Sequence, residues 1–261
     1  KCQAATSKPF AVNIPLLYPS VEEHMETIVE LKVPIVFTSA GSPKTWTSHL
    51  KSHGIIVAHV VSSSTFALKS ELADVDAVVA EGFEAGGHNG REETTTMCLI
   101  PAVSKACSIP VIAAGGLHDG KSVLAAMVLG AEGAQLGSRF VASEESSAHQ
   151  AFKDAVLSAG EGSTTFTLKE LTPVRMLHNP LFQELVQAQQ SGVSPERLAE
   201  ILGRGKAKMG MFEGDIENGE LEIGQIASLL NTVRPASEIV SEIVNDFREI
   251  GGTKLGKRFE F

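Results

Sequence analysis

The 261-residue chain is long enough to bury a large core, and its formal net charge of -9 argues against a general nucleic-acid binder, which usually has a basic surface. Hydrophobic residues make up 43% and charged residues 20% of the sequence, as is usual for globular proteins. The sequence contains no apolar run near the roughly 20 residues of a membrane-spanning helix. The three cysteines are sparse and form no CxxC pair, which favours a reducing, cytoplasmic location.

The first half of the chain alternates between short apolar runs and amphipathic stretches. The runs are rich in Val, Ile and Ala and lack a regular in/out alternation, as expected for parallel strands that are covered on both faces. The six predicted strands are Phe10–Ile14, Ile35–Ser39, Ile55–Val60, Ala77–Ala80, Val111–Ala114 and Gly133–Leu136. The predicted helices between them include Val21–Leu31, Thr96–Ala106 and Ser122–Leu129. This alternation predicts an α/β fold, either an open doubly wound sheet or a closed barrel.

The number of strands separates these two architectures. A closed barrel of this class has eight strands, and six are visible here. The sequence also begins inside a stretch with helical character, residues 1–7. We therefore expect a TIM (β/α)8 barrel that lacks its first two βα units in this chain, with an open sheet as the alternative.

After about residue 150 the pattern changes to helices separated by polar loops. The predicted helices are Ala151–Ala159, Leu181–Ser191, Ser194–Leu202, Ile223–Asn231 and Ala236–Phe247. Ser194 and Pro195 suit the N-cap and first position of a helix. The predicted organisation is a barrel domain over residues 1–150, a helical substrate or lid region over 151–222, and C-terminal helices over 223–261 that return to the barrel.

Two glycines after a buried strand form the strongest local signal. The run Ile109–Leu117 places Gly115 and Gly116 between a strand and a helix, and the next unit contributes Gly133–Phe140 with a further glycine at its strand end. Glycines let a backbone approach a ligand closely and present free N–H groups to it. Because the loops after the last two strands of a barrel commonly bind phosphate, we predict a phosphate site here rather than simple turns.

A second glycine-rich loop follows the strand at Ala77–Ala80. It contains His88 between Gly87 and Gly90, at the same end of the sheet as the predicted phosphate site. Histidine can give or take a proton near neutral pH. Its position favours a functional role over that of an exposed loop residue.

Other types of site find little support. The sequence has no complete dinucleotide fingerprint, because Gly203-Arg-Gly205 is followed by Lys208 at the third glycine position, and it has no GxxxxGK[ST] motif. None of the predicted strands contains a lysine, which disfavours Schiff-base chemistry. His49 and His53 could share a helix face but lack a third ligand, so no metal site is predicted.

Taken together and in order, the motifs resemble the nitronate monooxygenase-like flavoproteins. This family includes 2-nitropropane dioxygenase-type enzymes and flavin-dependent enoyl-acyl carrier protein reductases. The matching motifs are Glu84–His88, Ile112–Gly116, Leu136–Phe140, Thr172–Met176 and Gly224-Gln225, which together cover most of the chain. The resemblance implies a TIM barrel with a helical insertion that binds FMN without covalent attachment. Family members also begin with two further βα units, in agreement with the strand count.

The resemblance also implies a role for individual residues. His88 matches the active-site histidine of the family. Glu81 stands where the family often has Gln, so its contact is a departure from the pattern. The implied flavin-binding residues are Gly115, Gly116, Gln135, Leu136, Gly137 and Ser138 at the phosphate and ribityl end, Asn13, and Glu81, Gly86 and Gly87 on the ring side.

Three functions follow from this sequence. The first is an enoyl-acyl carrier protein reductase of fatty-acid elongation, in which NADH or NADPH is the co-substrate and His88 supports protonation of the enolate that forms from an enoyl thioester. The second is a nitronate monooxygenase, which needs no nicotinamide. The third is a decayed barrel that serves as a binding module. The expected partners are the acyl carrier protein thioester or a small nitronate, without nucleic acid or membrane, and a homodimer is one option for the assembly.

Overall fold

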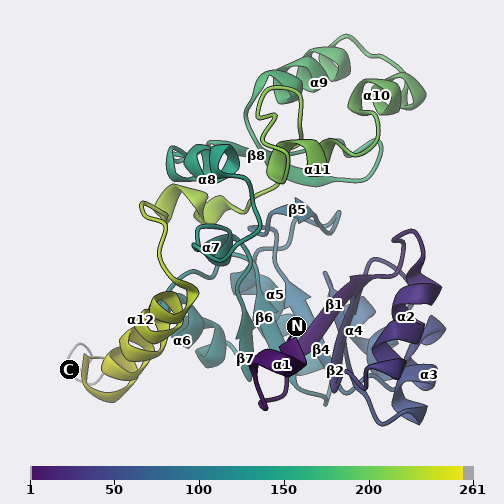
Figure 1. Cartoon of the computed structure of the whole chain (residues 1–261), viewed down its shortest axis with the longest axis vertical. Coiled ribbons are helices and arrows are strands. Elements are labelled where there is room, and N and C mark those ends of the chain that lie inside the picture. The colour runs from purple at the N-terminus through teal and green to yellow at the C-terminus, as the bar shows by residue number, and fades with distance from the viewer. Residues whose placement is uncertain (1, 255–261) are drawn as a thin grey trace.

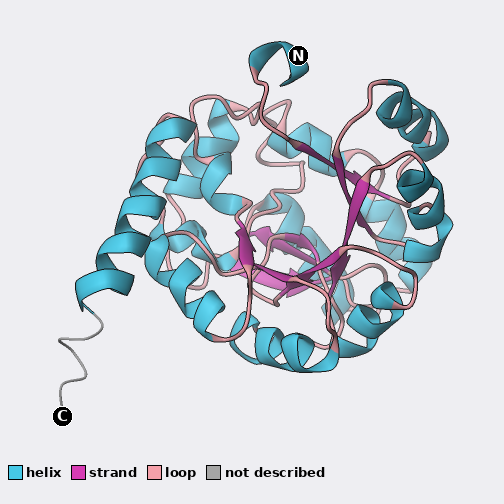
Figure 2. Ribbon diagram, turned by 90° about the horizontal axis from the view of Figure 1, so that it is seen from below, coloured by secondary structure: helices cyan, strands magenta, loops and turns pink. Residues whose placement is uncertain are grey.

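The computed structural model describes residues 2–254, with the backbone alone for the last two of these. The main sheet of the molecule is curled (Figure 2). It contains six parallel strands, and their spatial order follows the chain. The strands are β1 (Ala11–Pro15), β2 (Ile35–Ser39), β3 (Ile56–Val61), β4 (Ala77–Glu81), β6 (Val111–Ala114) and β7 (Gly133–Gln135). Each predicted strand is confirmed, with bounds that differ by one residue at most.

The helices between these strands cover the outer face of the sheet (Figure 2). They are α2 (Val21–Glu30), α3 (Thr47–Ser52), α4 (Ser64–Glu71), α5 (Thr96–Ala106) and α6 (Gly120–Val128), with a 3-10 turn η1 (Pro43–Thr45) before α3. The main core lies between helices and sheet, where Met25, Val36 and Leu99 are among the buried side chains. The inner face carries small residues such as Ala58 and Ala114, which leave room at the carboxyl ends of the strands.

The six-stranded sheet is open within residues 2–254, because β1 and β7 are its two edges. The predicted α/β fold with a parallel, barrel-like sheet is confirmed. The assignment of two further βα units to the barrel stays a prediction. A short helix α1 (Cys2–Ala5) precedes β1, within the stretch that the sequence marks as helical.

The second half of the chain extends away from the sheet (Figure 1). It contains a β-hairpin that the sequence analysis did not predict, because Thr164–Thr167 and Val174–Leu177 are short and separated by polar residues. The two-residue strand β5 (Gly87–His88) adds to this hairpin, in the order β5-β9-β8. The elements are α7 (Ser138–Val141), α8 (Gln150–Leu157), β8 (Thr164–Thr167), β9 (Val174–Leu177), α9 (Pro180–Gln190), α10 (Pro195–Leu202) and α11 (Lys206–Met211).

The C-terminal segment returns to the sheet side of the molecule (Figure 1). A 3-10 turn η2 (Gln225–Leu229) replaces most of the helix predicted at Ile223–Asn231. The helix α12 (Ala236–Glu249) packs against α6, and a Cβ on Gly120 would lie 2.2 Å from the amide nitrogen of Phe247. A last turn, η3 (Ile250–Lys254), follows, and residues 255–261 of the predicted C-terminal region lie outside the described residues.

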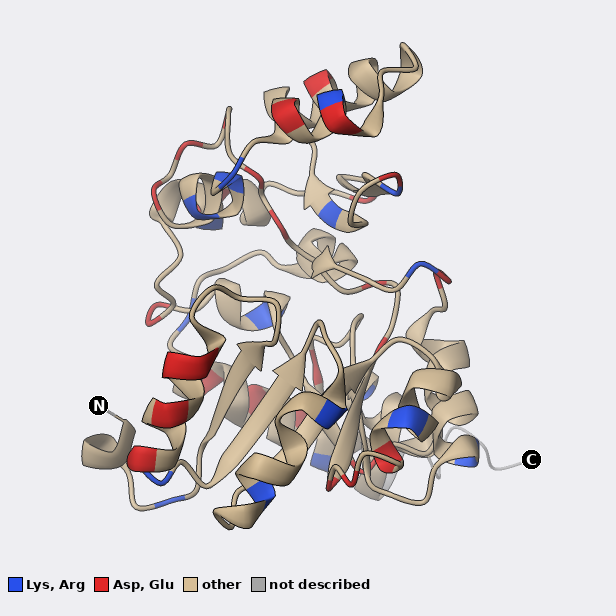
Figure 3. Ribbon diagram, turned by 90° about the vertical axis from the view of Figure 1, so that its right-hand side faces the viewer, with Lys and Arg blue, Asp and Glu red and all other residues tan. Residues whose placement is uncertain are grey.

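Charged side chains lie mainly on the helices and loops, around a sheet that carries few of them (Figure 3). Among the six parallel strands, Glu81 at the end of β4 is the single Asp, Glu, Lys or Arg residue. No helix within residues 2–254 is long and apolar enough to cross a membrane.

Candidate active site

A cavity of about 290 Å³ lies at the carboxyl ends of β4, β6 and β7. Its walls come from the loops that follow these strands and from a segment, residues 222–225, that we call the crossing segment. Most of the residues predicted to bind a cofactor line this cavity. They are Glu81, Gly86, Gly87, Gly115, Gly116, Gln135, Gly137 and Ser138.

The turn after β6 shapes one wall of the cavity. Gly115 and Gly116 have φ angles of 86° and 74°, a region that favours glycine. A Cβ on Gly115 would lie 2.7 Å from the carbonyl oxygen of Gly82, so the two loops can approach this closely only without a side chain. Within residues 2–254, the amides of Gly116, Leu117 and Gly137 donate no hydrogen bond. These free donors are what an anionic group at this wall would require.

The crossing segment closes the opposite wall. Its Gln225 amide donates to the Glu84 carbonyl at 2.9 Å, and its Gly224 amide donates to Ser138 Oγ at 2.9 Å. A Cβ on Gly86 would lie 2.3 Å from the carbonyl carbon of Ile223. Because Gly86 and Gly224 have no side chains, their backbones can pack closely. This packing fixes the crossing segment over the glycine-rich loop.

Two buried polar residues, Thr96 and Arg175, hold the glycine-rich loop after β4 in place. The Thr96 amide donates to the Glu84 carboxylate at 2.9 Å, and the Thr96 hydroxyl donates to the Gly115 carbonyl at 2.7 Å. The guanidinium of Arg175, which is 2% exposed, donates to the Phe83 carbonyl through Nε at 3.2 Å and Nη2 at 3.0 Å. It also lies 4.4 Å from the centroid of the Phe83 ring. These contacts rigidify the loop that carries His88.

Three of the predicted residues do not line the cavity. His88 is exposed on β5, opposite Val174 of β9, and its Nδ1 lies 3.3 Å from the Pro173 carbonyl oxygen. Leu136 packs against the main core. Asn13 is exposed on the edge strand β1, in a separate apolar groove. The roles predicted for these three residues stay predictions.

Glutamate side chains dominate the charge of the cavity. Burial raises the pKa of Glu81 to about 7, so that this carboxyl holds a proton under mildly acidic conditions. Burial also raises the pKa of Glu222, which lines the cavity, and charge on His88 opposes that rise. Its neighbour Glu220 has a pKa of about 7, because it is buried and faces the Glu222 charge. The site thus offers carboxyl groups that can exchange protons near neutral pH.

Glu222 lies directly beside the predicted catalytic loop. Along the edge of β9, Arg175 pairs with Gly87, and Met176 pairs with Glu222. A Cβ on Gly87 would lie 2.6 Å from Glu222 Oε2, so glycine is needed for this carboxylate to reach over the loop. Sequence reasoning missed Glu222, although the alternation of Glu220 and Glu222 with Leu221 and Ile223 is typical of a strand with one polar face.

The raised pKa of Glu81 makes stability depend on pH. The folded state binds more protons than the unfolded state between pH 4.5 and about 7, so the free energy of unfolding falls as pH rises through this window. In the parent protein we expect the free energy of unfolding to fall by on the order of 1–3 kcal/mol between these two pH values, and we expect Glu81→Gln to abolish this fall. Urea unfolding at both pH values measures the free energy of unfolding. Glu132→Gln, at an exposed residue, is the control. An unchanged pH dependence in Glu81→Gln would contradict the assignment.

Comparison with known proteins agrees with the fold and with the family that the motifs resemble. The family model described as nitronate monooxygenase matches residues 17–246. The chain therefore belongs to the nitronate monooxygenase family, and the resemblance inferred from the motifs is confirmed.

Relatives and solved structures narrow the comparison further. The chain is 34% identical over 236 residues to a probable nitronate monooxygenase of Staphylococcus aureus (strain MSSA476), which covers 87% of this chain and 66% of that protein. The chain thus spans just under two thirds of the length of such curated relatives. The structure of FabK from Thermotoga maritima matches 98% of this chain and 81% of its own, at 38% identity and a TM-score of 0.91. A nitroalkane oxidase from Streptomyces ansochromogenes matches 95% of this chain and 82% of its own, at 25% identity and a TM-score of 0.79.

Proposed function

We propose that this chain is the greater part of an FMN-dependent enoyl-acyl carrier protein reductase that uses NADH or NADPH. The observation that carries the proposal is the set of free amides at Gly116, Leu117 and Gly137, three residues that line the same cavity as Glu222. The similarity to FabK, an enoyl-acyl carrier protein reductase, supports this branch of the family, because it extends over nearly the whole chain.

The residues around the cavity fit a flavin phosphate. The turn at Gly115 and Gly116 has no side chain to block a ligand, and three unpaired amides offer hydrogen bonds to phosphate oxygens. The lining contains Glu81, Glu84 and Glu222 but no Lys, Arg or His, so the amides would have to neutralise the anion. Raised pKa values of Glu81 and Glu222 reduce the opposing negative charge. Bound FMN would supply hydride transfer to the enoyl substrate.

The residues of the chain itself would manage the proton. We assign His88 as the general acid that supports protonation beside the reacting carbon, and Glu222 as the carboxyl that holds charge next to it. Arg175 positions the loop through the Phe83 carbonyl, and the hairpin β8–β9 fixes His88 by pairing. We also assign residues 151–222 as the region that covers the substrate, since the crossing segment joins this region to the cavity wall.

Nitronate monooxygenase is the second candidate. It is favoured by the 34% identity to probable nitronate monooxygenases and by the likeness to a nitroalkane oxidase. The same His88 and Glu222 could then stabilise a nitronate, with oxygen as the second substrate and no nicotinamide. The reductase is preferred because the match to FabK is higher in identity and in coverage of both chains.

One assay separates these functions. We expect the purified protein, saturated with FMN, to oxidise NADH or NADPH only when a crotonyl thioester is present. Oxygen uptake with a nitronate and no dependence on nicotinamide would identify the monooxygenase instead. A colourless protein that binds no added FMN would contradict both and support a binding module.

A further inference from the structure

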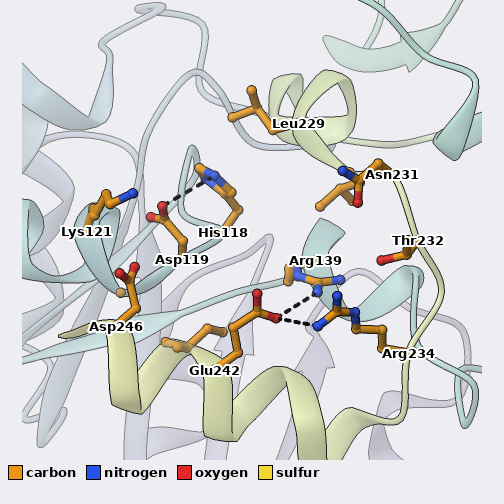
Figure 4. A pocket seen from close by; sticks show the side chains of 13 residues that line it. His118, Asp119, Lys121, Arg139, Leu229, Asn231, Thr232, Arg234, Glu242 and Asp246 are labelled. Carbon is orange, nitrogen blue, oxygen red and sulfur yellow. Dashed lines mark hydrogen bonds and ion pairs between the residues drawn. The ribbon is translucent and has the colours of Figure 1, made fainter. Parts of the chain in front are cut away.

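A second cavity, of about 360 Å³, lies at the start of α6 (Figure 4). The turn between β6 and α6, the helix α7, the loop before α12 and α12 itself enclose it. It shares no lining residue with the first cavity, although Arg139 directly follows Ser138, which lines that first cavity. Its volume falls within the range of about 300–1,000 Å³ that small-molecule sites occupy.

Arg139 is the unusual residue of this cavity. It is 9% exposed, and its guanidinium faces the cavity (Figure 4). Its nearest carboxylate oxygen, Glu242 Oε2, lies 3.8 Å away, beyond hydrogen-bond distance. Within residues 2–254 the guanidinium of Arg139 donates no hydrogen bond. Its donors are therefore open to the cavity, where a ligand could accept hydrogen bonds from them.

A second guanidinium competes for the same carboxylate. Arg234 Nη1 lies 3.3 Å from Glu242 Oε2, so one carboxylate faces two arginines. Burial lowers the pKa of Arg139 and the Arg234 charge lowers it further, while the Glu242 charge opposes both effects. Two adjacent guanidiniums with free donors match the geometry of a phosphoryl group, which accepts several charge-assisted hydrogen bonds at once.

The opposite wall has a different character. Lys121, Asp119 and Asp246 lie across the cavity from the two arginines (Figure 4). The Asp119 carboxylate is already occupied, because it accepts the Ser122 amide at 2.8 Å as the N-cap of α6. Asp246 offers carboxylate oxygens on this wall to ligand hydroxyl groups. One end of the cavity thus suits an anion and the other suits hydroxyl groups.

We propose that this second cavity binds a hydroxylated organic phosphate of about the size of a sugar phosphate. The phosphoryl group lies between Arg139 and Arg234, and the hydroxyl groups face Asp246. Inorganic phosphate alone would leave most of the 360 Å³ unfilled, so the carbon skeleton contributes to affinity. The proposal does not depend on the enzymatic activity proposed for the first cavity.

Calorimetry with ribose 5-phosphate on FMN-saturated protein tests the proposal. We expect binding that releases no FMN, that is at least ~10-fold tighter than for inorganic phosphate or ribose, and that Arg234→Gln weakens at least ~10-fold. Arg234 is partly exposed, so we expect Arg234→Gln to remain folded and to test the proposal even if Arg139→Gln unfolds. The exposed Arg197→Gln, in an ion pair with Glu200 on α10, is the matched control and should bind normally.

Four outcomes would overturn the proposal. They are absence of ribose 5-phosphate binding, equal affinity for inorganic phosphate, full affinity in both Arg234→Gln and Arg139→Gln, and release of FMN by the probe. The last outcome would place the probe in the flavin cavity instead.

Discussion

Gly116→Val is expected to lower the affinity for FMN by at least ~100-fold. Gly116 has a φ of 74°, which a β-branched residue adopts only under strain. A Cβ at this position would lie 3.3 Å from Glu84 Cβ, so the branched side chain must push the loop or turn toward the cavity. Either movement displaces the free amides of Gly116 and Leu117 from the phosphate wall. Flavin fluorescence during titration measures the affinity.

A matched variant separates the loss of the site from backbone strain. Gly162 has a φ of 75°, and a Cβ there would meet no atom within 4 Å. Gly162→Val therefore carries similar strain but lies outside the cavity, and should bind FMN normally. If Gly116→Val keeps its FMN affinity while remaining folded, the phosphate does not bind at this turn.

His88→Ala is expected to lower turnover with the enoyl thioester by about 10²–10⁴-fold while FMN content stays unchanged. The side chain does not line the cavity, so its removal opens no gap in the cavity wall. It does remove the charge that opposes the rise in the pKa of Glu222 and Glu220. The pH profile of turnover should therefore shift to higher pH in any residual activity, because these carboxyls ionise later.

The control for this variant is His24→Ala, another exposed histidine, on α2. Its turnover and pH profile should match those of the parent protein. Unchanged turnover in His88→Ala would show that His88 is an ordinary loop residue and that the proton comes from elsewhere, with Glu222 as the next residue to replace.

The parallel sheet was predictable because its strands carry their own signal. Runs such as Ile35–Ser39 and Val111–Ala114 are apolar on both faces, and each is bounded by turn residues. The hairpin was not predictable by the same reasoning. Its strand Thr164–Thr167 pairs with Val174–Leu177, and β5 has two residues, so tertiary pairing rather than periodicity creates these strands.

The candidate site was likewise predictable from the sequence only in part. The turn at Gly115 and Gly116 was predicted because two glycines directly after a buried strand indicate a backbone that turns sharply and leaves room for a ligand. Glu222 was missed because it reaches the cavity from a segment far along the chain, held there by the pairing of Met176 with Glu222 and by the contact with Gly87. Contacts between remote segments of this kind leave no spacing in the sequence to detect.

The hydrogen bond between Gly224 and Ser138 Oγ joins two residues that are 86 positions apart. Everything between them, including the hairpin and α8 to α11, leaves the barrel-like sheet and comes back at nearly the same point. An inserted segment whose two ends lie close together can vary in length or sequence at a small entropic cost to the rest of the fold. Replacement of this segment can therefore change which molecules reach the cavity, while the turn at Gly115 and Gly116 is retained.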